Sequence, residues 1–188
     1  MKKLVDKENL RIAVLEAAQQ LFISKGYENV GMRDIAQAVG KQPTQVYRLK
    51  LSKSDILAEL ILQLNAKQIE RVPKILSTIV GDSLYDKVCI YLERLYELDI
   101  EYLPLRSVGA AHGWSWTAEY EAKNNEQVIH LIAPIASWIA EAGLNDVHAR
   151  CIGMFSLYYV GFRGAVIRKL SANECLESIK PSLSYFCR

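Results

Sequence analysis

The stretch MRDIAQAVGKQPTQVYRLKLSKSD, residues 32–55, decides the fold of this chain. Residues 32–39 place apolar side chains at i, i+3, i+4 and i+7, which is the spacing of an amphipathic helix. Gly40 ends this helix, and Pro43 is well placed as the first residue of a helix over 43–49, because its missing N–H costs nothing there. Two short helices joined by a turn that contains glycine predict a helix–turn–helix.

Helices are also expected on both sides of this motif. On the N-terminal side, residues 9–25 have helical spacing, and the expected buried face comprises Ile12, Leu15, Ala18 and Phe22. On the C-terminal side, Ser52–Asp55 has the pattern of a capping box. A fourth helix is therefore expected to start there and to run to Val72, where Pro73 ends it.

The rest of the chain has the same helical character. Further helices are expected at 83–102, 105–115, 119–142, 145–169 and 173–186. Pro134 is expected to kink or split the third of these. Strand alternation is nowhere sustained, so the sequence predicts an all-α fold. It divides into an N-terminal three-helix domain with the helix–turn–helix, residues 1–53, and a C-terminal helical domain, residues 54–188.

Charge is distributed unevenly between these two parts. The 188 residues contain 23 Lys+Arg and 21 Asp+Glu, a net charge of +2. Residues 1–53 hold ten Lys/Arg and five Asp/Glu, a net of +5, whereas residues 54–188 hold 13 and 16, a net of −3. Between Lys41 and Lys53 there are four cations and no acid. Because this segment is the one that a helix–turn–helix presents to DNA, the cluster predicts binding to the phosphates of double-stranded DNA.

Composition excludes several other classes of protein. With 51% hydrophobic and 23% charged residues, the chain can bury enough apolar surface to fold. The uncharged apolar runs 127–140 and 151–162 are shorter than the roughly 18–20 residues of a membrane span, so no membrane partner is expected. The charged N-terminus is not followed by the apolar run of a signal peptide. The four cysteines are widely spaced, which favours free thiols in the cytoplasm and neither a metal site nor a cofactor.

Two segments carry a resemblance to a known family. RIAVLEAAQQLFISKGYENVGMRDIAQAVG, residues 11–40, and TQVYRLKLSKSDIL, residues 44–57, resemble the tetracycline-repressor (TetR) family of bacterial transcription regulators. The resemblance covers about a quarter of the chain, and together with the charge map it implies a DNA-binding site. That site comprises Arg33, Lys41, Gln42, Pro43, Thr44, Gln45, Tyr47, Arg48, Lys50 and Lys53.

These residues have different expected roles. The resemblance implies that Gln42–Gln45 open the recognition helix and face base edges in the major groove. Tyr47 and Lys53 match the family's phosphate-contacting positions, and Arg33 is expected near the DNA backbone. The remaining three cations are included for their charge alone.

The sequence departs from the family's pattern at several positions. The family usually has Ser at position 42 and Gly or Thr around 44–45, whereas this chain has Gln42 and Thr44-Gln45. The family usually has His-Phe at positions 49 and 50, whereas this chain has Leu49 and Lys50. Leu49 or Leu51 is therefore expected to replace the apolar plug between the third and fourth helices. For the same reason, the operator sequence is not expected to copy that of a relative.

The family typically joins its DNA-binding domain to a helical domain that binds a small molecule. The aromatic residues of the C-terminal part suit a small apolar or aromatic effector held by a few hydroxyl or indole donors. The predicted ligand-binding residues are Tyr91, Leu95, His112, Trp114, Trp116, Tyr120, Phe155, Tyr158 and Tyr159.

The last two expected helices predict a homodimer interface. Small residues would allow close helix approach, and aromatic residues would supply apolar area. These residues are Gly153, Gly161, Gly164, Ala165, Phe155, Tyr158 and Phe162. A two-fold dimer predicts a pseudo-palindromic operator.

These features together predict a ligand-responsive transcriptional regulator, a repressor that a small effector releases from a palindromic operator. A helical protein-interaction module with lost or altered DNA specificity is the alternative, since residues 42–50 differ from the family's pattern. An enzyme is disfavoured and no catalytic residue is assigned. The histidines are scattered, and the sequence has no GxSxG, no HExxH and no glycine-rich phosphate loop.

Overall fold

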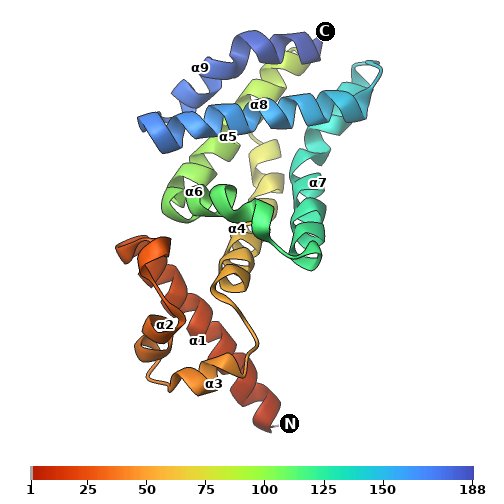
Figure 1. Cartoon of the computed structure of the whole chain (residues 1–188). Coiled ribbons are helices and arrows are strands. Elements are labelled where there is room, and N and C mark those ends of the chain that lie inside the picture. Colours follow the sequence, from red (N-terminus) through yellow and green to blue (C-terminus); the bar gives the residue numbers. More distant parts are fainter. Residues whose placement is uncertain (1) are drawn as a thin grey trace. The chain divides into compact units, whose positions relative to one another are not determined.

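The structure, a computed structural model, describes residues 2–188, with side chains from Asp6 onward. Over these residues the chain forms nine α-helices and three short 3₁₀ helices (Figure 1). The α-helices are α1 (Lys2–Lys25), α2 (Met32–Ala38), α3 (Pro43–Tyr47), α4 (Lys53–Leu76), α5 (Leu84–Glu101), α6 (Leu103–His112), α7 (Ala118–Glu141), α8 (Val147–Arg168) and α9 (Ala172–Leu183). The 3₁₀ helices are η1 (Tyr27–Asn29), η2 (Gly113–Ser115) and η3 (Ser184–Cys187). The predicted all-α fold class is confirmed.

The helices assemble into two compact units. The first unit comprises the chain up to Leu64 together with Pro104–Asn124, and the second comprises Asn65–Leu103 and Asn125–Arg188. Helices α4 and α7 therefore each begin in the first unit and end in the second. The first unit is larger than the helix–turn–helix alone, because most of α6 and the first turns of α7 belong to it. The predicted functional boundary between residues 53 and 54 falls at the start of α4 and stays a prediction.

The three-helix head of the first unit is built on α1. Its buried residues are Val14, Leu15, Ala18 and Phe22, and α1 contacts α2, which in turn contacts α3. The inclusion of Ile12 in this face was wrong, since Ile12 is 47% exposed. Each residue turns a helix by about 100°, so Val14 and Ile12 point to nearly opposite sides of α1. The predicted stripe on α4, in contrast, is buried throughout, at Leu57, Leu60, Ile61 and Leu64.

Two prolines have less effect on the helices than the sequence rules predict. Helix α4 continues past Pro73 to Leu76, and α7 is unbroken through Pro134. A proline removes one N–H donor from a helix ladder. In α4 this loss falls in the last turn, next to the buried Val72, so the packing of the helix outweighs it. The expected end at Val72 and the expected split at Pro134 were therefore wrong.

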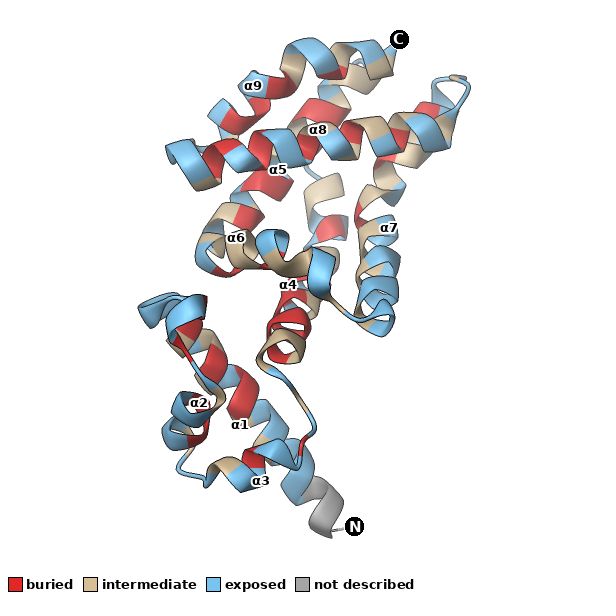
Figure 2. Ribbon diagram, viewed as in Figure 1, coloured by how far each residue is buried: buried red, intermediate tan, exposed pale blue. Residues whose placement is uncertain are grey.

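The second unit has a core formed by α5, α8 and α9, with parts of α4 and α7 (Figure 2). A polar group lies inside it: the carboxylate of Asp99 accepts hydrogen bonds from Gln68 Nε2 at 2.5 Å and from Tyr158 Oη at 2.7 Å. The hydroxyl of Tyr96 donates to the backbone oxygen of Tyr158 at 2.8 Å, and the two rings stack with centroids 4.3 Å apart. These bonds join α4, α5 and α8.

The apolar runs at 127–140 and 151–162 lie within α7 and α8. Each helix buries one side in the core of the second unit, including Leu131, Ile135 and Ile139 of α7. Among residues 2–188, no helix is long and apolar enough to cross a membrane. These runs therefore serve internal packing.

Candidate DNA-binding site

The turn between α2 and α3 is fixed by backbone hydrogen bonds. Gly40 has a φ of +64°, the left-handed conformation that suits glycine. The N–H of Lys41 donates to the Ala36 oxygen at 2.9 Å, and the N–H of Gly40 donates to the Gln37 oxygen at 3.0 Å. This pair of bonds is a Schellman motif, which satisfies the last carbonyls of α2 and turns the chain sharply. The predicted helix–turn–helix is therefore present.

Helix α3 starts at the predicted proline. Gln42 is the N-cap, Pro43 is the first helical residue, and the backbone N–H of Gln42 donates to Gln45 Oε1 at 3.0 Å. Because this bond occupies one lone pair of the Gln45 amide oxygen, the exposed Gln42 is the freer of the two glutamines for a bidentate contact to a base. The exposed Thr44 lies between them.

Helix α3 is attached to the head by one side and exposed on the other (Figure 2). Val46 is 1% exposed and Leu49 is buried, while Leu51 is half-buried, so Leu49 is the more buried of the two residues expected to replace the apolar plug. Tyr47 is 54% exposed. Of the predicted DNA-binding residues, those exposed are Arg33, Lys41, Gln42, Thr44, Gln45, Tyr47, Arg48 and Lys50, whereas Pro43 and Lys53 are half-buried.

The cations around α3 differ in their surroundings. Among the described residues, the side chains of Arg33, Lys41, Arg48 and Lys50 have no hydrogen bond or ion pair. The residue Lys50 has a φ of +59°, a conformation that costs most residues energy. Lys53 instead donates to the Tyr27 backbone oxygen at 3.1 Å and lies 4.1 Å from the centroid of the Tyr27 ring. One of its three N–H groups is thus used within the head.

This geometry defines a class of protein. A short helix, held on one side by buried apolar residues and surrounded by exposed cations, is a helix–turn–helix presented to DNA.

The family follows from comparison with known proteins. Residues 14–60 match the model of the family described as bacterial regulatory proteins, tetR family. This part of the N-terminal domain, about a quarter of the chain, is therefore similar to the corresponding region of tetR-family regulatory proteins. No curated protein matches the chain significantly in sequence.

Solved structures of similar fold match nearly the whole chain. A putative TetR-family transcriptional regulator from Mesorhizobium loti is 22% identical, with a TM-score of 0.65 and 96% of each chain covered. The transcriptional regulator FadR from Bacillus subtilis, solved with stearoyl-CoA, is 17% identical, with a TM-score of 0.67, 94% of this chain and 97% of its own covered. The TetR-family regulator PfmR from Thermus thermophilus is 22% identical, with a TM-score of 0.61 and 93% and 94% covered. At these identities the likeness establishes the fold.

The predicted ligand-binding residues are divided between the two units. Four lie in the first unit. His112 Nε2 lies 3.0 Å from Glu28 Oε1, and its ring lies against that of Tyr27. Trp114 is 97% exposed in η2, Trp116 is half-buried, and the hydroxyl of Tyr120 donates to Glu59 Oε1 at 2.8 Å. The structure therefore places His112 in polar contact with the head and Tyr120 in polar contact with α4.

The other five predicted residues lie in the second unit. Tyr91 and Leu95 are buried on α5, and Tyr91 donates to the Leu131 oxygen at 2.7 Å. On α8, the ring of Phe155 lies 6.4 Å from that of Tyr158 and 4.9 Å from that of Tyr159. This unit also has a cleft of about 420 Å³, lined by α5 and α9 residues that include Tyr85, Ile90 and Leu176. No residue of the predicted set lines this cleft. Their role in ligand binding stays a prediction.

Two polar groups could not be found from the sequence. Arg11 and Glu59 form an ion pair although they are 48 residues apart, and Asp99 and Tyr158 are 59 residues apart. In neither pair does the spacing along the sequence predict that the two residues are in contact. The only available signal was a charged or polar residue on an otherwise apolar helix face, as at Glu59 in the buried stripe of α4.

Proposed function

We propose that the chain is a dimeric repressor that acts in the cytoplasm, binds a pseudo-palindromic operator through α3, and is released from it by a small apolar or aromatic effector. The exposed face of α3 carries this proposal. It presents Gln42 and Thr44 for base edges and lies among cations that have no partner within the described residues. The family's regulatory role supports it.

Selection of DNA from a random library with the purified chain tests the proposal. Enrichment of a sequence with two related half-sites is expected, because a two-fold dimer presents two copies of α3. Failure to enrich any sequence above the starting library contradicts the proposal and favours the alternative, a module that works through protein contacts.

The salt dependence of binding gives a quantitative check. Each head exposes four cations at the helix–turn–helix, Arg33, Lys41, Arg48 and Lys50, that have no partner within the described residues. A dimer can therefore neutralise about eight phosphates with them, and the slope of log K against log salt is expected to be about −7. Lys50→Gln would remove one contact from each head and make the slope shallower by about 2. Lys169→Gln is the matched control, since Lys169 is also exposed and also has a φ of +59° but lies at the end of α8. An equal effect of the two substitutions would contradict the assignment of Lys50.

The dimer is proposed to form through the outward side of α8. The glycines expected at the interface are used inside the chain: a Cβ on Gly153, Gly161 or Gly164 would meet Phe186, Tyr96 or Leu170. Tyr158 and Phe162 are likewise buried inside the second unit. The exposed apolar residues of α8 are instead Ile152, Tyr159, Val160 and Ile167. Their seven-residue spacing, 152 to 159 and 160 to 167, keeps them on one side of the helix and suits a second copy of this chain.

A pair of isoleucines tests this surface. Ile167 on α8 and Ile129 on α7 are both 62% exposed. Ile167→Asp is expected to shift the chain from dimer to monomer in sedimentation velocity, because the charge would be buried between two copies. Ile129→Asp is expected to leave the dimer intact. If both variants stay dimeric, another surface forms the interface.

The apolar character of the effector is supported by the aromatic surface of the second unit and by the FadR structure, which was solved in complex with stearoyl-CoA. Stearoyl-CoA and naphthalene are suitable probes of an extended and an aromatic ligand. Release of the selected DNA by either one supports an apolar effector. Retention of the DNA with both, at saturating concentrations, would contradict this part of the proposal.

A further inference from the structure

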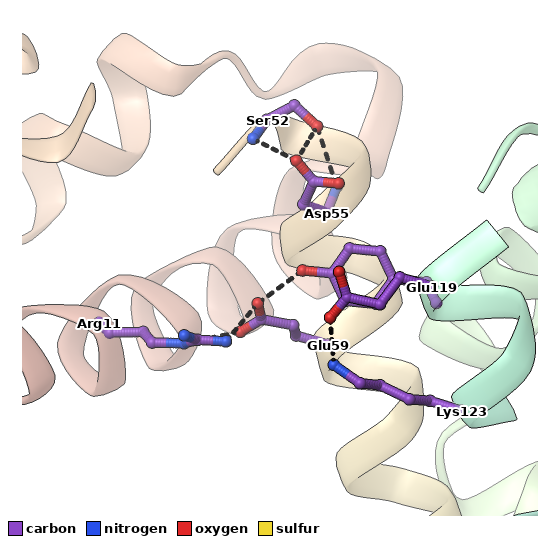
Figure 3. Close-up of polar contacts among 7 residues, drawn as sticks. Arg11, Ser52, Asp55, Glu59, Glu119 and Lys123 are labelled. Atoms are coloured by element: carbon purple, nitrogen blue, oxygen red, sulfur yellow. Dashed lines mark hydrogen bonds and ion pairs between the residues drawn. The ribbon is translucent and has the colours of Figure 1, made fainter. Parts of the chain in front are cut away.

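A buried carboxylate connects three helices of the first unit (Figure 3). The side chain of Glu59, on α4, is 8% exposed. Arg11 of α1 donates to it twice, from Nη2 to Oε1 at 2.6 Å and from Nε to Oε2 at 3.0 Å. Tyr120 of α7 donates its hydroxyl to Oε1 at 2.8 Å. The group Arg11, Glu59 and Tyr120 is called the Glu59 link below.

The chemistry of the Glu59 link makes it strong and specific in geometry. A bidentate pair between a guanidinium and a carboxylate fixes both the distance and the relative orientation of the two groups. The hydrogen bond to Glu59 is the main reason that the pKa of Arg11 is raised. The pKa of Tyr120 is raised by burial and then by Glu59, so its hydroxyl stays protonated and remains a donor. Because a buried carboxylate is costly when a partner is removed, α1 and the start of α7 are held together through α4.

The position of Tyr120 gives the link a second property. Helix α7 begins at Ala118 in the first unit, two residues before Tyr120, and runs without a break to Glu141 in the second unit. There Leu131, Ile135 and Ile139 are buried in the core, and the Leu131 oxygen accepts from the Tyr91 hydroxyl. The residue that donates to Glu59 and these core residues therefore belong to the same unbroken helix.

We propose that Glu59 and Tyr120 are positioning residues for operator binding: they hold α1, and with it the recognition helix α3, in the placement that matches the spacing of two half-sites. Withdrawal of Tyr120 from Glu59, when an effector displaces α7, would loosen the head. This inference rests on the proposed function and adds to it the residues through which the head is held. Neither residue touches DNA in this scheme; both act through α1.

The first experiment uses the DNA that the wild-type chain selects, together with versions in which the half-site spacing is changed by one base pair. Tyr120→Phe removes only the hydroxyl. It is expected to weaken binding to the selected DNA about tenfold, since a hydrogen bond to a charged group is lost. It is also expected to reduce the preference for the native spacing, because a loosened head would bind DNA of the native spacing and DNA of the changed spacing alike. A purely structural role would change the melting temperature and leave this spacing preference unchanged.

Tyr96→Phe is the matched control. It also removes a buried tyrosine hydroxyl, the one that donates to the Tyr158 oxygen, but it lies in the second unit and outside the Glu59 link. Spacing preference should be unchanged in this variant. Glu59→Gln retains an acceptor for Tyr120 and should have a smaller effect than Glu59→Ala, with folding of each variant checked by circular dichroism.

The outcomes separate the two proposals. Wild-type affinity and wild-type spacing preference in Tyr120→Phe would overturn this inference alone, and so would an equal loss of spacing preference in Tyr96→Phe. If the wild-type chain selects no DNA sequence, the proposed function fails and this inference fails with it.

Discussion

Replacement of Gly161 by alanine is expected to destabilise the second unit strongly. An added Cβ would lie 2.1 Å from Tyr96 Oη and 2.9 Å from the backbone oxygen of Cys175. Neither neighbour can move away easily. Tyr96 is 0% exposed, its ring is stacked on Tyr158, and its hydroxyl is bonded to the Tyr158 oxygen. The Cys175 oxygen belongs to the backbone of α9.

The size of the effect follows from three contributions. Overpacking of a dense core costs about 1–3 kcal/mol. Loss of the Tyr96 hydrogen bond in a buried place costs about 1–3 kcal/mol. Alanine in a helix regains about 0.5–1 kcal/mol relative to glycine. The free energy of unfolding is therefore expected to fall by about 3 kcal/mol, which lowers the melting temperature by about 6–12 °C for a chain of this size.

Thermal unfolding followed by circular dichroism measures this change, with Gly143→Ala as the control. Gly143 has a φ of +70° and an open space around its Cβ position, so only backbone strain of about 1 kcal/mol is expected there. In the double variant Gly161→Ala/Tyr96→Phe, the hydroxyl oxygen that lies nearest to the added Cβ is absent. The loss of unfolding free energy should therefore be smaller than the sum of the losses in the two single variants. A loss below about 1 kcal/mol for Gly161→Ala, or full additivity in the double variant, would refute the steric reasoning.

Three other features of the structure can be checked separately. Ser171→Ala should lower the free energy of unfolding by about 1 kcal/mol, because the Ser171 hydroxyl caps α9 by accepting a hydrogen bond from the Glu174 N–H. Ser171→Thr should retain most of this stabilisation, since threonine can also cap a helix. Burial raises the pKa of Cys187 from 9.0 to about 11, so its alkylation by iodoacetamide at pH 8 should be about 100-fold slower than in urea and should accelerate up to about pH 11. The same shift means that unfolding releases a proton, so stability should fall as the pH rises from 9.0 to about 11. Lys50→Asn should leave stability unchanged or slightly raised, since asparagine tolerates a positive φ, while DNA binding weakens.

The sequence predicted the elements whose signals are local. Gly40 and Pro43 lie within four residues of each other and set the turn and the start of α3, and both act through their own backbone geometry. The errors arose where tertiary packing decided the outcome. Pro73 ends a helix by local rules, but α4 gains enough from its buried side to continue for three residues. Ile12 and Val14 are equally apolar, and only the position of α2 and α3 determines which is buried.

The candidate site was predictable to the same extent. The exposed face of α3 follows from motif and charge, because both are properties of consecutive residues. The aromatic residues of the C-terminal part could not be sorted in this way. Tyr120, Tyr158 and Tyr159 have the same chemistry in the sequence, yet one binds Glu59, one is buried beside Asp99, and one is 47% exposed on α8. Their environments depend on partners that lie on other helices.

The charge of the head shows why position matters more than the total. Residues 1–53 have a net charge of +5, but Arg11 is neutralised by Glu59 from outside this range and Lys53 is held over Tyr27. Both contribute to holding the head together. Within the described residues, the cations on α2 and beside α3, including Arg48 and Lys50, have no hydrogen-bond or ion-pair partner and lie at the helix–turn–helix. Since counterion release requires charges that can approach phosphates, the proposal predicts that the DNA-binding strength of the head depends on these exposed cations, whereas its placement on the operator depends on the pair of Arg11 and Glu59.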